Sequence, residues 1–245
     1  MSDISRELDA IVSGRLADDR PIMFELADQV VPVYREFRHD LILTDAVRGM
    51  NVGSFLHRIL SAEAVQLDVE APRLLHVANS RWRSLNGPLF EKLLGSLRRV
   101  HTKEQIDYIR IFGGWARRAL LVTDRVSTGG SMRRLGRVAR AAGIRALDYA
   151  ILSTSDTSKE ELARKIRAGD ESRICAVTVN HELCLSKPEI IDDFAYFTVY
   201  GNPRPQRSMF DSVFPRALFP AAVEKFYRDT ANDYIAERLN GGEQP

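Results

Sequence analysis

Residues 119–131 read Ala-Leu-Leu-Val-Thr-Asp-Arg-Val-Ser-Thr-Gly-Gly-Ser, and this stretch decides the fold that we predict. Its apolar first half is typical of a central parallel strand that is covered on both faces. Asp124 follows the apolar run, and a turn of small and hydroxyl residues then leads into a helical pattern. Ligands of open α/β sheets bind beyond the carboxyl ends of such strands. The order of strand, acid, short loop and helix therefore predicts an α/β protein with a ligand site at this loop.

The rest of the chain repeats the alternation of strand and helix. Apolar runs predict further strands at 41–45, 72–77, 144–152 and 173–179. Helical spacing of apolar residues predicts helices at 22–37, from 132 to a cap at Gly143, at 157–168 and at 221–239. Such alternation favours a parallel twisted sheet flanked by helices. We divide the chain into an N-terminal helical segment (1–39), an α/β core (40–182) and a C-terminal extension (183–245), interpreted as a lid or hood.

The loop after Asp124 has the residue types of an anion site. Gly129 and Gly130 allow a tight turn whose N–H groups point at one anion. Hydroxyl donors come from Ser127, Thr128 and Ser131, and the following helix turns the positive end of its dipole to the same place. We expect a phosphate to bind here. An ordinary strand-to-helix turn uses the same residue types, so the loop alone leaves that interpretation open.

Residues 122–131 also resemble a known motif. Val-Thr-Asp-Arg-Val-Ser-Thr-Gly-Gly-Ser is similar to the phosphoribosyl pyrophosphate (PRPP) motif of type I phosphoribosyltransferases, and most similar to that of the orotate enzymes. The resemblance implies that Asp124 binds the ribose hydroxyls and that Ser127, Thr128, Gly129, Gly130 and Ser131 surround the 5′-phosphate. Thr123 stands where the family has a first acidic residue, so the resemblance implies only a hydroxyl contact to the ribose there.

The same resemblance implies functional roles for two further segments. Members of the family have a pyrophosphate-binding loop after an early strand, and Arg48-Gly49 follows the predicted strand 41–45. A guanidinium suits phosphate oxygens, although a surface Arg beside a turn Gly is the alternative. Residues 101–115 stand where the family has a closing hood, which implies a catalytic role for Lys103 beside Asp124. Mg²⁺ would arrive with the pyrophosphate, and we expect no protein side chain to bind the metal directly.

The resemblance implies transfer of ribose 5-phosphate to a nitrogenous base or similar acceptor with release of pyrophosphate. Purine-specific members often have an acid at the position of Ser127, so an orotate-like or unidentified acceptor is favoured. Because Thr123 brings no charge, a non-catalytic PRPP or nucleotide binder on the same fold stays open as an alternative. An unrelated α/β enzyme for another phosphorylated metabolite is a second alternative, since a fold does not fix a function.

The composition narrows the class of protein. At 245 residues with 44% hydrophobic and 28% charged residues, the chain is typical of a soluble globular protein. A net charge of +2 gives no general case for nucleic-acid or membrane binding, and we interpret the arginines at 133, 134, 137 and 140 as a solvated helix face. Only Cys175 and Cys184 are present, which favours a reducing, cytoplasmic location. We interpret the first helices as a cap or a dimer surface, and we expect a homodimer.

Overall fold

The computed structural model describes residues 19–45, 49–77, 102–126, 128–154, 158–178 and 218–241. Its strands are β1 (Leu41–Asp45), β2 (Arg73–Val77), β3 (Arg118–Val126), β4 (Ala146–Thr154) and β5 (Ile174–Thr178). Its helices are α2 (Arg20–Phe37), α3 (Met50–Gln66), α5 (Gly130–Ala141), α6 (Lys159–Ile166) and α8 (Leu218–Tyr234), which continues into a π-helical turn at Ile235–Leu239. Residues 102–113 are also helical.

The strands form one five-stranded sheet in the order β2-β1-β3-β4-β5, and every neighbouring pair is parallel. In the central pair, Leu41 lies opposite Ala119 and Thr44 lies opposite Val122. The structure thus confirms an α/β protein with a parallel sheet flanked by helices. The inner strand β3 is buried at all but its first residue and Arg125, as expected for a strand covered on both faces.

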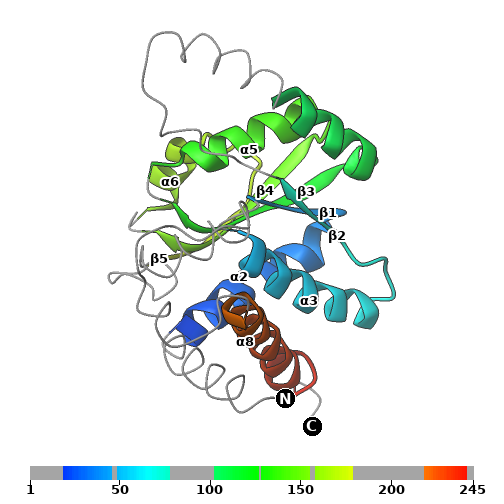
Figure 1. The fold of residues 1–245 in the computed structure, drawn as a ribbon, viewed down its shortest axis with the longest axis vertical. Helices are drawn as coiled ribbons and strands as arrows, with labels where there is room; N and C mark the ends of the chain where they lie inside the picture. Colours follow the sequence, from blue (N-terminus) through cyan, green and yellow to red (C-terminus); the bar gives the residue numbers. More distant parts are fainter. Residues whose placement is uncertain are drawn as a thin grey trace.

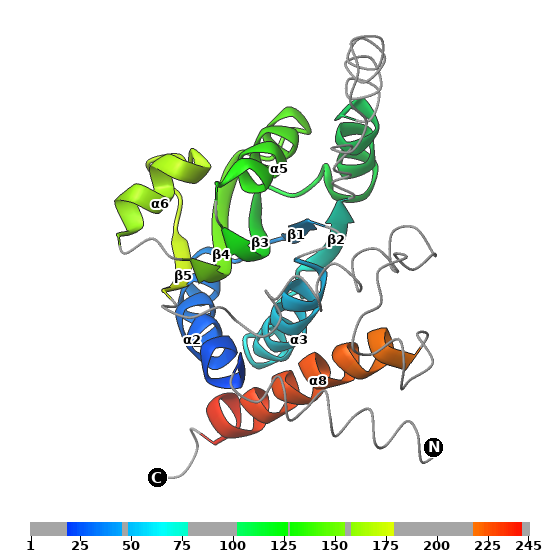
Figure 2. The same cartoon turned by 60° about the vertical axis from the view of Figure 1, so that its left-hand side comes forward.

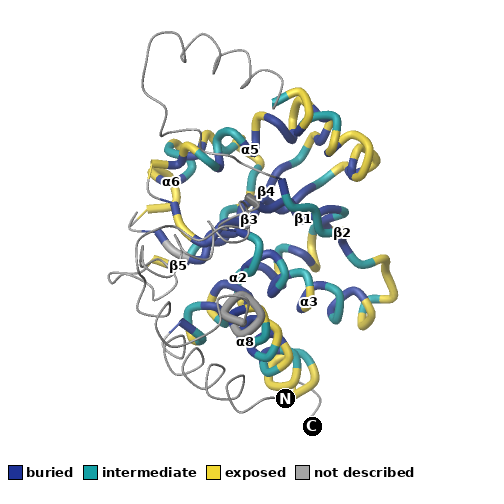
Figure 3. The backbone as a smooth tube through the Cα atoms, viewed as in Figure 1, coloured by how far each residue is buried: buried dark blue, intermediate teal, exposed yellow. Residues whose placement is uncertain are grey.

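The helices cover the two faces of the sheet as separate groups (Figure 1). On one face, α2, α3 and α8 pack around a core that includes Ile42, Leu120 and Leu152. On the other face, α5, α6 and the helix at 102–113 pack around Leu43, Leu121 and other alternate residues of the same strands. Because successive strand side chains point to opposite faces, each strand contributes to both cores. Figure 3 shows the consequence, a buried sheet between helices whose outer surfaces are exposed.

The segments before and after the predicted α/β core contribute to its packing. Helix α8 runs across α2 and α3 on the side away from the sheet (Figure 2), and its Tyr234 hydroxyl donates to Asp28 of α2 at 2.9 Å. The Tyr234 ring also meets Phe24 edge to face. Helix α2 contains Pro32 without ending there, although a proline inside a helix removes one backbone hydrogen bond. Among the described residues, no helix has the length and apolar character needed to cross a bilayer.

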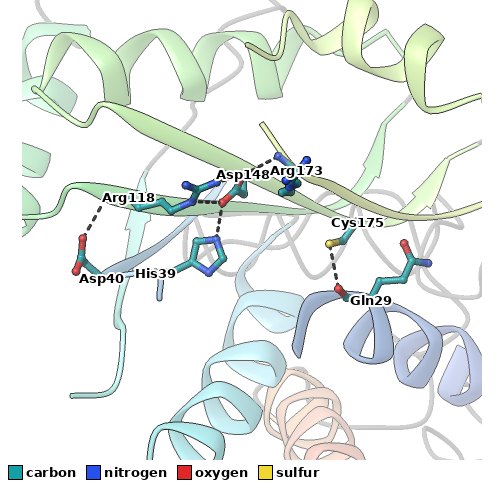
Figure 4. A network of polar contacts seen from close by, with 7 residues as sticks. All are labelled: Gln29, His39, Asp40, Arg118, Asp148, Arg173 and Cys175. Carbon is teal, nitrogen blue, oxygen red and sulfur yellow. Dashed lines mark hydrogen bonds and ion pairs between the residues drawn. The ribbon is translucent and has the colours of Figure 1, made fainter. Parts of the chain in front are cut away.

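A buried ionic network ties together the amino-terminal edge of the sheet (Figure 4). Asp148 of β4 accepts from His39 Nε2 at 2.8 Å, from Arg118 Nη2 at 3.0 Å and from the Arg173 backbone N–H at 2.7 Å. The side chains of His39 and Asp148 are completely buried. Arg118 and Arg173 both stack on the ring of Phe37. One carboxylate therefore joins the start of β3, the start of β5 and the segment before β1.

Candidate anion-binding site

The opposite edge of the sheet contains a point where the chain changes direction. Strands β1 and β3 are neighbours, and their carboxyl ends lie at the same edge because they are parallel. After β1 the chain enters α3 on one face, and after β3 it enters α5 on the other. Diverging connections of this kind open a crevice at the carboxyl edge, where open α/β sheets bind their ligands. The starts of the helices that follow the two predicted anion loops therefore lie at one edge of the sheet.

The helices that leave β1 and β3 begin without side-chain caps. Gly49 precedes α3 and Gly129 precedes α5, and neither helix has an acidic residue in its first turn. Helix α6 begins differently, because the Ser158 hydroxyl accepts from the Glu161 N–H at 3.1 Å and two acids lie in its first turn. The first N–H groups of a helix need partners outside the helix. At α3 and α5 these groups suit an anion, whereas at α6 the protein supplies the cap itself.

The turn before α5 requires glycine. Gly129 has a φ of 69°, in the left-handed region, and a Cβ atom built on it would lie 2.5 Å from the Lys165 carbonyl oxygen. The turn therefore packs directly against the end of α6. Thr128 and Gly130 are exposed and Ser131 is half-buried, so a ligand at this turn would reach all three.

Asp124 lies beside the turn but is nearly covered. It is 5% exposed, and its Oδ1 accepts from the Arg125 backbone N–H at 2.7 Å and from the Thr123 hydroxyl at 3.4 Å. Burial raises the pKa of the Tyr227 hydroxyl well above its usual value, and the negative charges of Asp19 and Asp124 raise it further. Helix α8 thus brings Tyr227 near Asp124. No local sequence pattern predicts that Tyr227 lies near Asp124, because the two residues are distant in sequence.

A polar contact joins the ends of β1 and β2. The Thr44 hydroxyl and His76 Nδ1 are 2.6 Å apart, and Thr44 is fully buried. Burial lowers the pKa of His76, and the nearby His57 lowers it further, so the ring is neutral near pH 7. A Cβ atom on Gly53 would collide with the Thr44 methyl group, so the first turns of α3 approach β1 very closely. The half-buried His76 therefore contributes a hydrogen bond within the fold.

The predicted site residues fall into three groups. Gly49, Thr123 and Asp124, with the turn residues from Thr128 to Ser131, lie on β3 or at the helix starts that follow β1 and β3. Arg48 and Ser127 lie outside the described residues. Lys103 is exposed near the start of the helix at 102–113, so the predicted hood is in large part helical. Gly113 and Gly114 are the end of this helix and the turn after it.

Metal ligands are scarce in the part of the chain that the structure describes. No group of three or more His, Cys, Asp or Glu side chains gathers there in a way that could bind a metal ion. The polar groups at the ends of β1 and β3 are backbone N–H and hydroxyl donors, with Asp45 and Asp124 as acceptors. This set suits a sugar phosphate better than a bare cation.

The fold and the candidate site define an α/β protein with a parallel sheet and two uncapped helix starts at its switch point. Comparison of the chain with protein-family models, curated proteins and solved structures finds no match.

Proposed function

We propose that this protein binds PRPP at the carboxyl edge of its sheet and transfers ribose 5-phosphate to a nitrogen acceptor. One observation carries the proposal: the phosphate-loop motif and the Arg-Gly loop follow neighbouring parallel strands, β3 and β1. PRPP has phosphate groups at two ends of one ribose. Two loops at one edge, each leading into an uncapped helix, match that distribution of charge.

Each group at the edge has a chemical task in this proposal. The turn from Ser127 to Ser131 binds the 5′-phosphate, and Thr123 and Asp124 bind the ribose hydroxyls. Arg48 and Gly49 bind the pyrophosphate, with Lys103 reaching it from the helix at 102–113. In the reaction the bond from ribose carbon 1 to pyrophosphate oxygen breaks, pyrophosphate leaves with the electron pair, and an acceptor nitrogen bonds to carbon 1 and releases its proton to solvent. Fixed donors around the phosphates stabilise the charge that develops on the leaving group.

Magnesium belongs to the substrate in this proposal. Mg²⁺ bound to the pyrophosphate neutralises charge as the leaving group departs. The proposal needs no protein side chain to bind the ion.

A non-catalytic PRPP binder is the second candidate, and two observations favour it. Thr123 is uncharged where the related family has an acid, and Asp124 has only 5% of its surface exposed. A single, mostly covered carboxylate can position a ribose but gives little charge to the reacting sugar. The binding test and the turnover test below separate the two candidates.

The binding test is calorimetric titration of the full chain with PRPP and Mg²⁺. In Asp124→Asn, binding should weaken by about 1.5–3 kcal/mol, the range for a hydrogen bond to a charged group. Asp170→Asn is the matched control, because Asp170 is exposed and lies beyond α6. Equal affinities of the Asp124 variant and the unmodified protein would remove Asp124 from the site.

The turnover test measures pyrophosphate release from PRPP with a panel of acceptors: orotate, uracil, purine bases and simple amines. An enzyme releases pyrophosphate with one acceptor class and loses that release in Asp124→Asn. PRPP binding without release for any acceptor would favour the non-catalytic candidate. Absence of PRPP binding would exclude both and leave an α/β protein for a different phosphorylated ligand.

A further inference from the structure

A second basic site lies outside the crevice, between α5 and α6. An open pocket of about 480 Å³ is lined by Arg133, Arg137, Arg140 and Arg167. The first three belong to α5, and Arg167 follows the last residue of α6 with a left-handed φ of 56°. Two elements that are separate in sequence thus direct guanidinium groups into one hollow of the surface. Its volume lies within the usual range for small-molecule sites.

The electrostatics of this pocket are unusual for a protein surface. Helix α5 contains no acidic residue, and none of the pocket arginines forms an ion pair within the described part of the chain. Four acids occur nearby in sequence, Glu160 and Glu161 at the start of α6 and Asp170 and Glu171 after it, and none pairs with them. Like charges gathered in this way repel one another and destabilise the free protein. A bound anion removes that repulsion.

The spacing of the arginines indicates the size of the anion. Arg133, Arg137 and Arg140 recur at intervals of four and three residues, which places them on one helix face over about 10 Å. Arg167, which follows α6, lines the same pocket. Guanidinium groups bind phosphate oxygens through paired hydrogen bonds. A concave site that is lined by arginines from two elements matches a compact anion of several charges better than an extended strand of nucleic acid, which follows an open groove.

We propose that this pocket binds a compact polyphosphate, either inorganic or as the polyphosphate group of a nucleotide. The proposal rests on the pocket and its arginines, independently of any activity at the crevice. The pocket nevertheless begins close to the candidate phosphate turn, because a Cβ atom built on Gly130 would lie 4.0 Å from the Arg133 guanidinium. An anion that orders Arg133 would therefore act next to the start of α5.

The test is calorimetric titration of the full chain with inorganic tripolyphosphate, without magnesium and at moderate salt. The unmodified protein should bind one equivalent. Arg137→Ala combined with Arg140→Ala should weaken binding by at least about tenfold, since two charge-assisted contacts are lost. Both residues are exposed, but the Arg140 side chain also interacts with the hydroxyl of the buried Tyr149, so urea unfolding of the double variant must first show that its fold is intact. Arg145→Ala is the matched control, because Arg145 is an exposed arginine that does not line the pocket, and its affinity should stay within about twofold.

Further titrations identify the source of the anion and keep the two proposals separate. Binding of ATP in competition with tripolyphosphate would show that a nucleotide supplies the polyphosphate, and failure of ATP to compete would assign the site to inorganic polyphosphate. A short single-stranded RNA that binds more tightly than tripolyphosphate, with a steep salt dependence, would overturn the proposal in favour of an RNA-binding face. Equal tripolyphosphate affinity of the double variant and the unmodified protein would also overturn it. PRPP titrated into the double variant measures binding at the crevice alone. Absence of PRPP binding there would contradict the proposed function but not the proposal of a polyphosphate pocket.

Discussion

The two edges of the sheet use polar groups in opposite ways. At the amino-terminal edge, Asp148 is completely buried and receives donors from three different segments. At the carboxyl-terminal edge, α3 and α5 start without side-chain caps, and the turn before α5 is held open by Gly129. Both oxygens of the buried Asp148 carboxylate have donors, as a buried charge requires, whereas a binding site needs donors that the fold leaves available. We therefore infer that the amino-terminal edge stabilises the fold, and we propose the carboxyl-terminal edge as the place where a ligand binds.

The largest effect should come from Asp148→Asn. Burial by itself would raise the pKa of Asp148, but the hydrogen bonds from His39, Arg118 and the Arg173 N–H lower it to about 2, so the group is ionised at neutral pH. Removing its charge leaves the Arg118 guanidinium without its buried partner. We expect the free energy of unfolding to fall by about 3–5 kcal/mol, as for other broken buried pairs. Urea unfolding measures the change.

The exposed Asp170→Asn is the control for that measurement and should stay within about 0.5 kcal/mol. The PRPP affinity of folded Asp148→Asn should be unchanged, because the network is at the far edge. A variant as stable as the unmodified protein would show that the amino-terminal edge does not stabilise the fold in the way that we infer.

Acid should weaken the same edge without any mutation. The pKa of Asp148 is about 2 in the folded chain, against an ordinary value of 3.8. A carboxyl group with a lowered pKa stabilises the fold at every pH above its unfolded value, and this contribution is lost as the pH falls from about 4 through about 2. The shift corresponds to about 2 kcal/mol. Urea unfolding at a series of pH values should therefore show a loss between pH 4 and pH 2 that is smaller in Asp148→Asn.

The sequence predicted the strands well and this network not at all. Strand β1 has the predicted bounds, because five mostly apolar residues before a loop form a pattern visible in a short window. Asp148 instead lies inside an apolar run, and its partners are 109, 30 and 25 residues away. Likewise, the approach of Tyr227 to Asp124 depends on how α8 packs. Local patterns encode elements and turns, whereas contacts between distant segments appear only after the helices have packed.

At the carboxyl-terminal edge, Gly129→Ala should disturb both folding and binding. An alanine at a φ of 69° costs about 1–2 kcal/mol, and its Cβ atom would also press on the Lys165 carbonyl oxygen. We expect a loss of stability in urea unfolding together with weaker binding of ribose 5-phosphate in calorimetry. Gly143→Ala is the matched control, since Gly143 also has a positive φ but no neighbour within 4 Å of a new Cβ atom. Gly143→Ala should lose stability and keep its affinity for ribose 5-phosphate. An equal loss of affinity in both variants would show that the Gly129 turn does not contact the ligand.

The smallest predicted effects come from two serines at the starts of neighbouring helices. Ser158 caps α6, so Ser158→Ala should lower the free energy of unfolding by about 1 kcal/mol and leave ribose 5-phosphate binding unchanged. Ser131 lies in the first turn of α5, and its hydroxyl makes no hydrogen bond within the described residues. Ser131→Ala should therefore stay within about 0.5 kcal/mol in stability while binding ribose 5-phosphate more weakly, because no described residue uses that hydroxyl and the proposed ligand does. Urea unfolding and calorimetry on both variants check this contrast: Ser158→Ala should lose stability but not affinity, and Ser131→Ala should lose affinity but not stability. If Ser131→Ala instead lost stability and kept its affinity, the start of α5 would be a structural cap like that of α6, and the contrast between the two edges would lose its support at the phosphate turn.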